Sequence, residues 1–240
     1  MRRWQLIKIS DGSALTLSPI RIDERILHYL AGMQYLDDRL TGIIEPVSAI
    51  GELVNSQRIL ADRVVAILAK TPQQGLPVIQ LCGVENASKR SIAATACQIM
   101  GLSLCVIAAQ AVPVIPAELE NLIRLWTRET ILSGSGLLLD CEELDFGDAT
   151  RMNAIGHLVD RLGGILIISS REGLRMRERA AVRIDVQKPN SIEQSQVWEE
   201  TLATIVPELN GQAKTLVNQF NLNATTIRAA CAEAAGCIQQ

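Results

Sequence analysis

The sequence predicts an α/β fold: five parallel strands form a sheet covered by helices, with a small N-terminal appendage and three C-terminal helices. Two observations carry this prediction. Short apolar segments typical of buried strands alternate with helical or loop segments through the middle of the chain, an order that favours a parallel sheet. Beyond Pro189 the strand-like segments stop and helical segments continue. We therefore divide the chain into residues 1–43, 44–188 and 189–240.

Each predicted element rests on hydrophobic periodicity and on the turn residues that flank it. The N-terminal segment WQLIKI alternates, and the Asp11-Gly12 turn after it suggests a hairpin. The strands of the sheet are expected at 78–82, 104–108, 136–141, 164–169 and 182–186. Helices are expected within 21–32 and 34–42, and at 48–70, 117–132, 149–162, 191–205, 211–220 and 224–235.

Composition indicates a soluble, cytoplasmic globular protein. Of the 240 residues 48% are hydrophobic and 3% aromatic, and the net charge is −3, which argues against a nucleic-acid-binding surface. The six cysteines lack metal-ligand spacing and are expected to be reduced packing residues. The start MRRWQLIKIS has no secretion signal, and glutamines and prolines interrupt the uncharged stretch 91–117, so we expect no membrane span.

The stretch 78–101 combines a buried strand, a polar loop and an apolar helix expected to begin near Ile92. This layout is typical of the phosphate-binding pattern G-x-x-x-x-G-K-[ST], in which backbone N–H groups and a lysine hold phosphates. Gly83 takes the first position and Lys89 the lysine position, so we expect the Lys89 side chain to face solvent. An ordinary turn between a strand and a helix, with a lysine in the first turn, fits this stretch as well.

Three residues depart from the phosphate-binding pattern. Ser88 replaces the second glycine, whose missing Cβ allows close backbone approach. Arg90 replaces the hydroxyl that binds Mg²⁺, and Ser91 offers a hydroxyl one place too late. We expect Arg90 to pair with a phosphate or with Asp140, which argues against a bound magnesium ion.

A second signal is the apolar run GLLLDCEEL at 136–144, which ends in acidic residues. An aspartate at such a strand end can hold Mg²⁺, and a following glutamate can orient the attacking water. Asp140 occupies the first of these positions, but Cys141 stands at the second, and Glu142 points to the other face if the strand continues. Acidic loop residues after a strand are also common without any catalytic role.

Taken together, the two signals resemble the AAA+ ATPase superfamily over about residues 44–239. The chain is most similar to the first ATPase-like domain of the large AAA+ proteins encoded with extracellular contractile injection systems. Residues 21–40, 118–144 and 223–234 carry this closer resemblance. The family implies a winged-helix segment before the core, of which residues 1–20 would be the end, and a second ATPase domain after it. The chain therefore resembles a fragment.

The resemblance also implies roles for individual residues. Arg177 or Arg179 matches the finger that reaches a neighbouring subunit's nucleotide, and solvated surface charge is the alternative for each arginine. Ser169 or Ser170 stands at the sensor of the γ-phosphate, and Arg228 at the second sensor. The positions that correspond to binding of ATP or ADP are Gly83, Ser88, Lys89, Arg90, Ser91, Asp140, Ser170 and Arg228, with Asp140 also at the metal.

Three functional hypotheses follow. The first is a degenerate AAA+ domain that binds ATP or ADP weakly or not at all and packs in a ring with copies of itself or with a second AAA+ domain. Its partners would be components of a contractile injection system. The second is an active Mg²⁺-dependent ATPase, in which Ser91 and Glu142 replace the missing groups and Asp140 and Glu142 are the catalytic candidates. The third is a winged-helix DNA-binding module.

Overall fold

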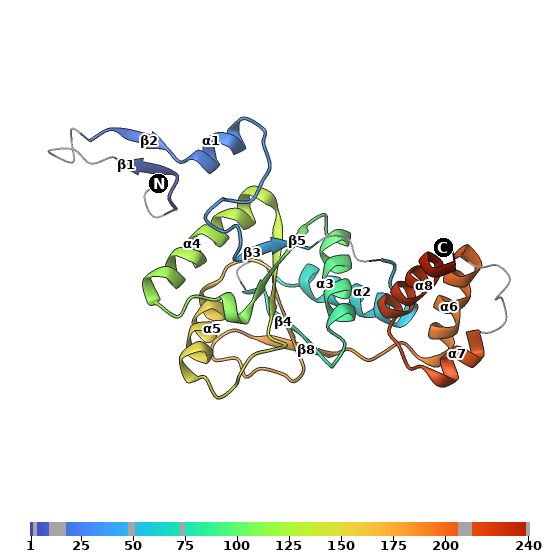
Figure 1. The fold of residues 1–240 in the computed structure, drawn as a ribbon. Coiled ribbons are helices and arrows are strands. Elements are labelled where there is room, and N and C mark those ends of the chain that lie inside the picture. The colour runs from blue at the N-terminus through green and yellow to red at the C-terminus, as the bar shows by residue number, and fades with distance from the viewer. Residues whose placement is uncertain (2–3, 10–17, 48–50, 73–74, 206–212, 239–240) are drawn as a thin grey trace.

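The computed structural model describes residues 1, 4–9, 18–47, 51–72, 75–205 and 213–238. It has three parts, which follow one another along the chain (Figure 1). An N-terminal hairpin and short helix precede a central sheet flanked by helices, and three helices at the far end form what we call the lid. The turn predicted at Asp11-Gly12 lies outside the described residues.

The predicted strands and most predicted helices are present, with small shifts at their ends. The strands are β1 (Ile7–Ile9), β2 (Ile20–Ile22), β3 (Ile44–Pro46), β4 (Val78–Cys82), β5 (Ser103–Ala108), β6 (Ser135–Asp140), β7 (Leu166–Ser170) and β8 (Ala181–Asp185). The helices are α1 (Glu24–Leu30), α2 (Asn55–Ala69), α3 (Asn86–Ile99), α4 (Pro116–Ser133), α5 (Ala149–Arg161), α6 (Ser191–Ile205), α7 (Ala213–Gln219) and α8 (Ala224–Ile238). Over the described ranges, none of these helices combines the length and apolar character needed to cross a bilayer.

The central sheet has six strands in the order β3-β5-β6-β7-β4-β8. Five of them are parallel, as predicted, and β3 pairs antiparallel with β5 at one edge. The first parallel strand, β4, lies between β7 and β8, so the chain passes over two strand positions between β4 and β5. The predicted fold class is therefore confirmed, and β3 is an additional edge strand that the sequence pattern did not reveal.

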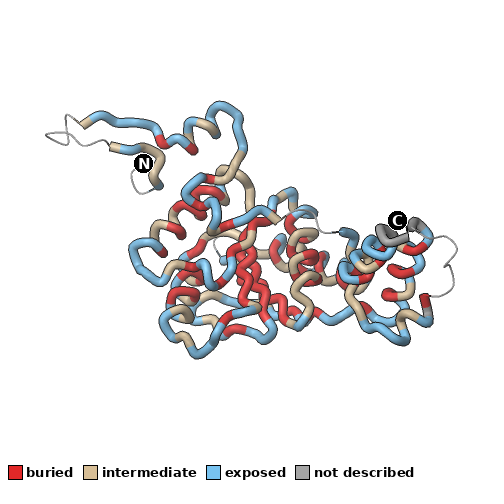
Figure 2. The backbone as a smooth tube through the Cα atoms, in the orientation of Figure 1, coloured by how far each residue is buried: buried red, intermediate tan, exposed pale blue. Residues whose placement is uncertain are grey.

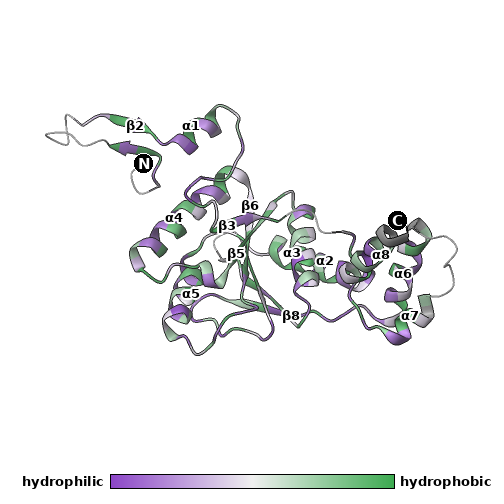
Figure 3. Ribbon diagram, viewed as in Figure 1, coloured by the Kyte–Doolittle hydropathy of each residue, from purple (hydrophilic) through white to green (hydrophobic). Residues whose placement is uncertain are grey.

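Helices cover both faces of the sheet because its central strands are apolar on both sides. All five residues of β4 and of β7 are buried, and these strands form the buried centre of the molecule (Figure 2). One hydrophobic cluster joins α4 and α5 to one face, and a second joins α2 and α3 to the other. Apolar and polar residues alternate around these helices in the pattern of amphipathic helices that cover a sheet (Figure 3).

Two predicted helices outside the candidate site differ from the structure. The helix expected at 48–70 is α2, which begins only at Asn55, because the preceding Val54 has an extended backbone. The helix expected within 34–42 is a series of turns. Here the carboxylate of Asp37 accepts a hydrogen bond from the backbone N–H of Arg39, the local bond by which aspartate favours a turn over a helix.

The N-terminal appendage is attached to α4 by buried ion pairs. Arg25 of α1 donates to Glu129 of α4 at 3.0 and 3.1 Å, and these two side chains are 2% and 0% exposed. Arg128, the residue before Glu129 in α4, donates to Asp23 at 3.1 Å and also pairs with Asp37. Charged residues of the appendage thus pair with the buried charges of α4. The domain boundary predicted after residue 43 remains a prediction.

We expect that replacing one member of the buried pair, with Arg25→Met or Glu129→Leu, lowers the free energy of unfolding by about 3–5 kcal/mol, because the other charge is left buried and unpaired. The double variant should recover most of this loss, since two apolar side chains of similar size need no partner. Urea denaturation measures all three, with the exposed Glu118→Leu on the same helix as control. Additive losses in the double variant would contradict a direct pairing.

Candidate functional site

The sheet topology brings together the strand ends at which the sequence placed its site. The carboxyl ends of β4, β6 and β7 are neighbours, with Cys82 opposite Ser170 and Asp140 opposite Ser169. Helix α3 leaves β4 on one face of the sheet, whereas α4 and α5 follow β5 and β6 on the other. This reversal of direction is where ligands bind in open parallel sheets.

Gly83 begins the loop after β4 and has a conformation that only glycine adopts readily. Its φ is +141°, and a Cβ there would lie 2.2 Å from the carbonyl oxygen of Val186. The backbone just before Gly83 is also close to Val186, whose N–H donates to the carbonyl of Cys82 at 2.6 Å. A glycine is therefore required at position 83, because the backbone that follows β8 lies too close for a Cβ atom.

The loop between β4 and α3 is short, because α3 begins at Asn86 and not near Ile92 as predicted. The aligned Lys89 is consequently inside the helix, and its backbone N–H donates to the carbonyl of Glu85 at 3.1 Å. In a phosphate-binding loop the N–H groups around the lysine are free to bind the ligand. Here the amide of Lys89 already has a helical partner.

The side chain of Lys89 is fully buried, so the expectation that it faces solvent is wrong. Its ammonium group forms an ion pair with Glu142 and donates to the carbonyl oxygens of Gly83 and Ser170, the latter at 2.9 Å. An ammonium group has three N–H donors, and these three acceptors use all of them. The burial follows from the early start of α3, which turns this side chain toward the strand ends.

Arg90 pairs with Asp140, which confirms one of the two arrangements expected for it. Its guanidinium donates to a carboxylate oxygen of Asp140 at 2.6 Å, and the Asn86 amide donates to the same oxygen at 3.2 Å. Burial alone raises the pKa of Asp140, but the hydrogen bonds from Arg90, the Glu142 backbone and Asn86 outweigh it and lower that pKa. Asp140 is thus a charged acceptor already held by the protein.

Glu142 points into this site because β6 ends at Asp140. From the sequence we expected Glu142 to point to the other face only if the strand continued past Asp140. Its carboxylate accepts from Ser169 at 2.9 Å in addition to Lys89, and its backbone N–H donates to Asp140 at 3.1 Å. Cys141 is buried, and burial together with the neighbouring carboxylates raises the pKa of its thiol to about 12. Cys141 therefore stays protonated near neutral pH and is no general base.

The remaining predicted hydroxyl groups bond within the protein. Ser88 accepts a hydrogen bond from the buried Gln57 of α2 at 3.0 Å. Ser91 donates to the carbonyl of Ala87, one helical turn earlier, at 2.9 Å. Ser170 turns toward the carbonyl of Glu172 at 2.7 Å, so Ser169 is the serine of this pair that faces the site.

The three predicted arginines lie in different places. Arg228 of α8 donates to the carbonyl of Glu52 at 2.9 Å, at the junction of lid and core. Arg177 is exposed and donates to Asn153 of α5. Arg179 lies at the amino end of β8, the edge of the sheet opposite to the Gly83 loop, where it donates to four carbonyl oxygens; burial lowers its pKa. The finger roles of Arg177 and Arg179 stay predictions.

Sequence analysis missed three residues of the site. Asn86 bridges Asp140 and Ser169, Gln57 binds Ser88, and Glu85 connects the loop to the lid through the Asn223 amide. Asn86 could have been found, since asparagine is frequent at the first positions of helices. Gln57 gave no comparable signal, because a polar residue in an amphipathic helix is usually exposed.

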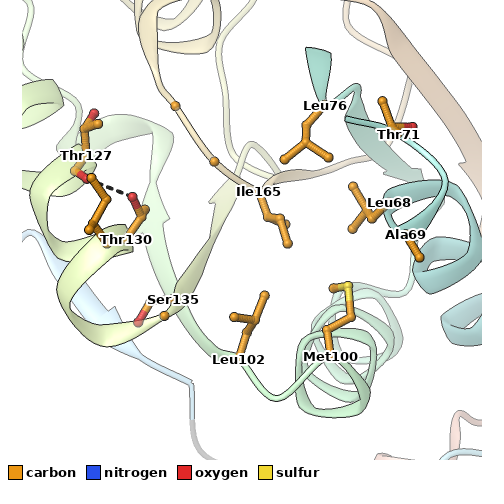
Figure 4. A pocket seen from close by; sticks show the side chains of 14 residues that line it. Leu68, Ala69, Thr71, Leu76, Met100, Leu102, Thr127, Thr130, Ser135 and Ile165 are labelled. Carbon is orange, nitrogen blue, oxygen red and sulfur yellow. Dashed lines mark hydrogen bonds between the residues drawn. The ribbon is translucent and has the colours of Figure 1, made fainter. Parts of the chain in front are cut away.

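One sizeable cavity lies away from these residues. It has a volume of about 740 Å³ and is walled by the ends of α2, α3 and α4 at the amino ends of the strands (Figure 4). Its threonines, Thr71, Thr127 and Thr130, donate their hydroxyls to carbonyls of their own helices, so the wall is largely apolar. None of the residues predicted to bind nucleotide lines this cavity.

The charged groups of the site do not fit a bound magnesium nucleotide in this arrangement. Lys89 and Arg90, the two cations that would meet phosphate, are paired with Glu142 and Asp140, the two carboxylates that would meet a metal or a water. Within the described ranges, no three His, Cys, Asp or Glu residues gather in a way that could hold a metal ion. The site is an internal network of ion pairs.

Comparison with known proteins gives a family match for the lid and a fold likeness for most of the chain. Residues 190–240 match the family model described as "Contractile injection system ATPase helical domain". This match covers the lid alone, and it agrees with the relationship predicted for that part of the chain. No curated protein matches the chain.

Among solved structures, the chain is similar to PCH-2 of C. elegans, with a TM-score of 0.54 and 8% identity over 79% of this chain and 66% of that one. It also matches the replication initiator DnaA bound to AMPPCP and single-stranded DNA, with a TM-score of 0.47 and 14% identity over 77% of this chain and 62% of that one. The likeness to PCH-2 shows the fold alone. The chain spans less than two thirds of either protein.

A double-mutant cycle tests the buried pair of Lys89 and Glu142. We expect Lys89→Met to lower the free energy of unfolding by about 3–5 kcal/mol, because the Glu142 charge loses its partner, and Lys89→Met with Glu142→Leu to recover part of it. A lysine reserved for phosphate would instead tolerate replacement. Chemical denaturation measures the cycle, with the exposed Lys70→Met as control, and a loss below about 0.5 kcal/mol for Lys89→Met would contradict the pairing.

A second test concerns the pKa of Asp140. Arg90→Met should raise this pKa, since burial remains while the strongest opposing hydrogen bond is lost. In the unmodified protein the folded pKa lies below the ordinary 3.8, so ionised Asp140 stabilises the fold above that pH, and the contribution is lost as the pH falls through the folded pKa. Carboxyl ¹³C NMR follows the titration, with the exposed Arg63→Met as control. An unchanged pKa would show that Arg90 does not hold this carboxylate.

Proposed function

We propose that this chain is an AAA+ domain of a contractile injection system that neither hydrolyses ATP nor holds it firmly, and that it serves as a structural element beside an active ATPase domain. The observation that carries the proposal is the internal pairing of its site. Lys89 and Arg90, the two cations aligned with phosphate contacts, are neutralised by carboxylates of the same chain.

Binding of a nucleotide would require two ion pairs to separate. A phosphate could replace Glu142 as partner of Lys89, but Glu142 would then keep its charge at a largely buried position with Ser169 as its remaining side-chain partner. A magnesium ion would need Asp140, which Arg90 holds at 2.6 Å. Leaving a buried charge without its partner costs several kcal/mol, and this cost reduces the affinity for any ligand that causes it.

Backbone geometry opposes binding in the same way. The loop after β4 comprises only residues 83–85 before α3 begins, so it is too short to surround a triphosphate with free N–H groups. Glu85 adds a carboxylate at the N-terminus of α3, where a phosphate would otherwise be favoured by the helix dipole. These two features support weak or absent binding of ATP and ADP.

The contacts also weigh against the hypothesis of an active ATPase. That hypothesis needs Ser91 to serve the metal and Glu142 to orient water, yet Ser91 donates to Ala87 and Glu142 is bound by Lys89 and Ser169. Cys141, at the position of the water-orienting glutamate, has a thiol whose pKa is raised to about 12. The chain therefore offers no free group for either role among the residues aligned with them.

The structural role rests on the lid. Residues 190–240 match a helical domain of contractile injection system ATPases, and the core has the fold of PCH-2. A domain that keeps this fold while its charged site is internally paired retains surfaces for packing in an assembly. We propose that it packs in a ring with copies of itself or with a second AAA+ domain and contacts other components of the injection system.

Calorimetric titration with ATP and ADP, with and without Mg²⁺, tests the proposal together with a phosphate-release assay. We expect no turnover and a Kd weaker than about 1 mM, because two ion pairs must open. Arg90→Thr with Cys141→Glu should remain inactive, since Lys89 stays paired and α3 still begins at Asn86. Mg²⁺-dependent turnover by the unmodified chain, absent from Lys89→Met, would overturn the proposal.

A further inference from the structure

The lid packs against the residue that precedes α2, although this residue lies in the part of the sequence assigned to the core. Val54, the residue before α2, is 8% exposed, and it is part of the hydrophobic cluster of the lid. The other buried members of that cluster are Val197, Trp198, Leu202, Ala213, Ala224, Ile227 and Cys231. Val54 therefore completes the lid interior, and the backbone on either side of it must stay beside the lid.

Helix α2 has no cap of its own. Val54 has no side-chain acceptor for the free N–H groups, and the first turn contains no acidic residue. Glu193 of α6 provides the missing acceptor: its carboxylate accepts from the Ser56 N–H at 2.7 Å and from the Ser56 hydroxyl at 2.9 Å. A buried carboxylate at a helix N-terminus is stabilised by the helix dipole, so the lid acts as the cap of a core helix.

Further contacts also join the lid to the core. Arg228 of α8 donates to the carbonyl of Glu52 at 2.9 Å and packs on Gly51, where a Cβ would lie 3.3 Å from its guanidinium. Asn223 caps α8 by accepting from the Thr226 N–H at 2.8 Å and turns its amide to Glu85 in the loop after β4. Lys188 also approaches Glu85, at 3.4 Å.

We propose that these side chains form a clamp that holds the lid on the core without a nucleotide. The lid clamp comprises Val54, Ser56, Glu85, Glu193, Asn223 and Arg228. Its contacts join protein groups directly, so the angle between lid and core is the same in the absence and presence of ATP. The inference is independent of the proposed function, since a chain that bound ATP could still hold its lid in this way.

Spin labels carried by orthogonal keto side chains at two exposed positions, Asp62 of α2 and Glu199 of α6, report the angle as a distance distribution. The unmodified chain should give one narrow distribution that Mg²⁺-ATP leaves unchanged. Glu193→Ala should broaden it and speed amide exchange in the first turn of α2 about fivefold, the factor expected for a lost helix cap. Arg228→Ala should broaden the distribution without changing that exchange.

Controls separate the outcomes. Glu233→Ala removes the same charge from an exposed site of the lid and should leave both measurements unchanged, and circular dichroism establishes that each variant is folded. A distance that shifts when ATP is added to the unmodified chain overturns the clamp, as does a narrow distribution in both Glu193→Ala and Arg228→Ala. Calorimetric binding of ATP with an unchanged distance would refute the proposed function and support the clamp.

Discussion

The ammonium group of Lys89 is the point at which three strand ends of this domain are joined. It binds the carbonyl of Gly83 after β4, the carbonyl of Ser170 at the end of β7, and the carboxylate of Glu142 after β6. A buried ammonium group without acceptors would be unstable, so these three backbones must converge wherever the lysine is enclosed. The convergence fixes the loops at the carboxyl edge of the sheet and leaves the Lys89 ammonium group no N–H for a ligand.

The neighbouring pair extends this constraint. Arg90 binds Asp140, and Asn86 connects Asp140 to Ser169, which in turn donates to Glu142. The two ion pairs are thus linked by side-chain hydrogen bonds, while the buried Nε of Arg90 has no partner. A site of this kind gains its stability from internal contacts that an exchangeable ligand would have to break.

The sequence was sufficient to predict the fold because the strands are apolar and the helices amphipathic. It placed β4 and the lid helix α6 at their observed ends. It could not reveal β3, whose three residues have no distinct pattern, or the turn at Asp37, where a side-chain hydrogen bond overrides helical periodicity.

The site was harder to predict, because alignment to a motif fixes which residues are near the strand ends but not which way they point. Lys89, Asp140 and Glu142 lie at the same strand ends, although the sequence predicted that Lys89 faces solvent and that Glu142 points away if the strand continues. The burial of Lys89 depended on α3 beginning at Asn86, six residues before the apolar periodicity becomes visible. Which of several neighbouring charged side chains form an ion pair depends on the assembled fold, and no local sequence pattern determines it.

The position of Val54 shows that the packing of the lid does not follow the boundary that the sequence pattern suggests near residue 189. Strand-like segments end before residue 189, yet the interior of the helices beyond it is completed by a residue from more than a hundred positions earlier. A chain ended at that boundary would expose Val54 and leave the N–H groups of Ser56 and its neighbours to water, while the isolated helices would carry a hole in their interior. Core and lid consequently share packing and capping contacts across the boundary that the sequence pattern suggests.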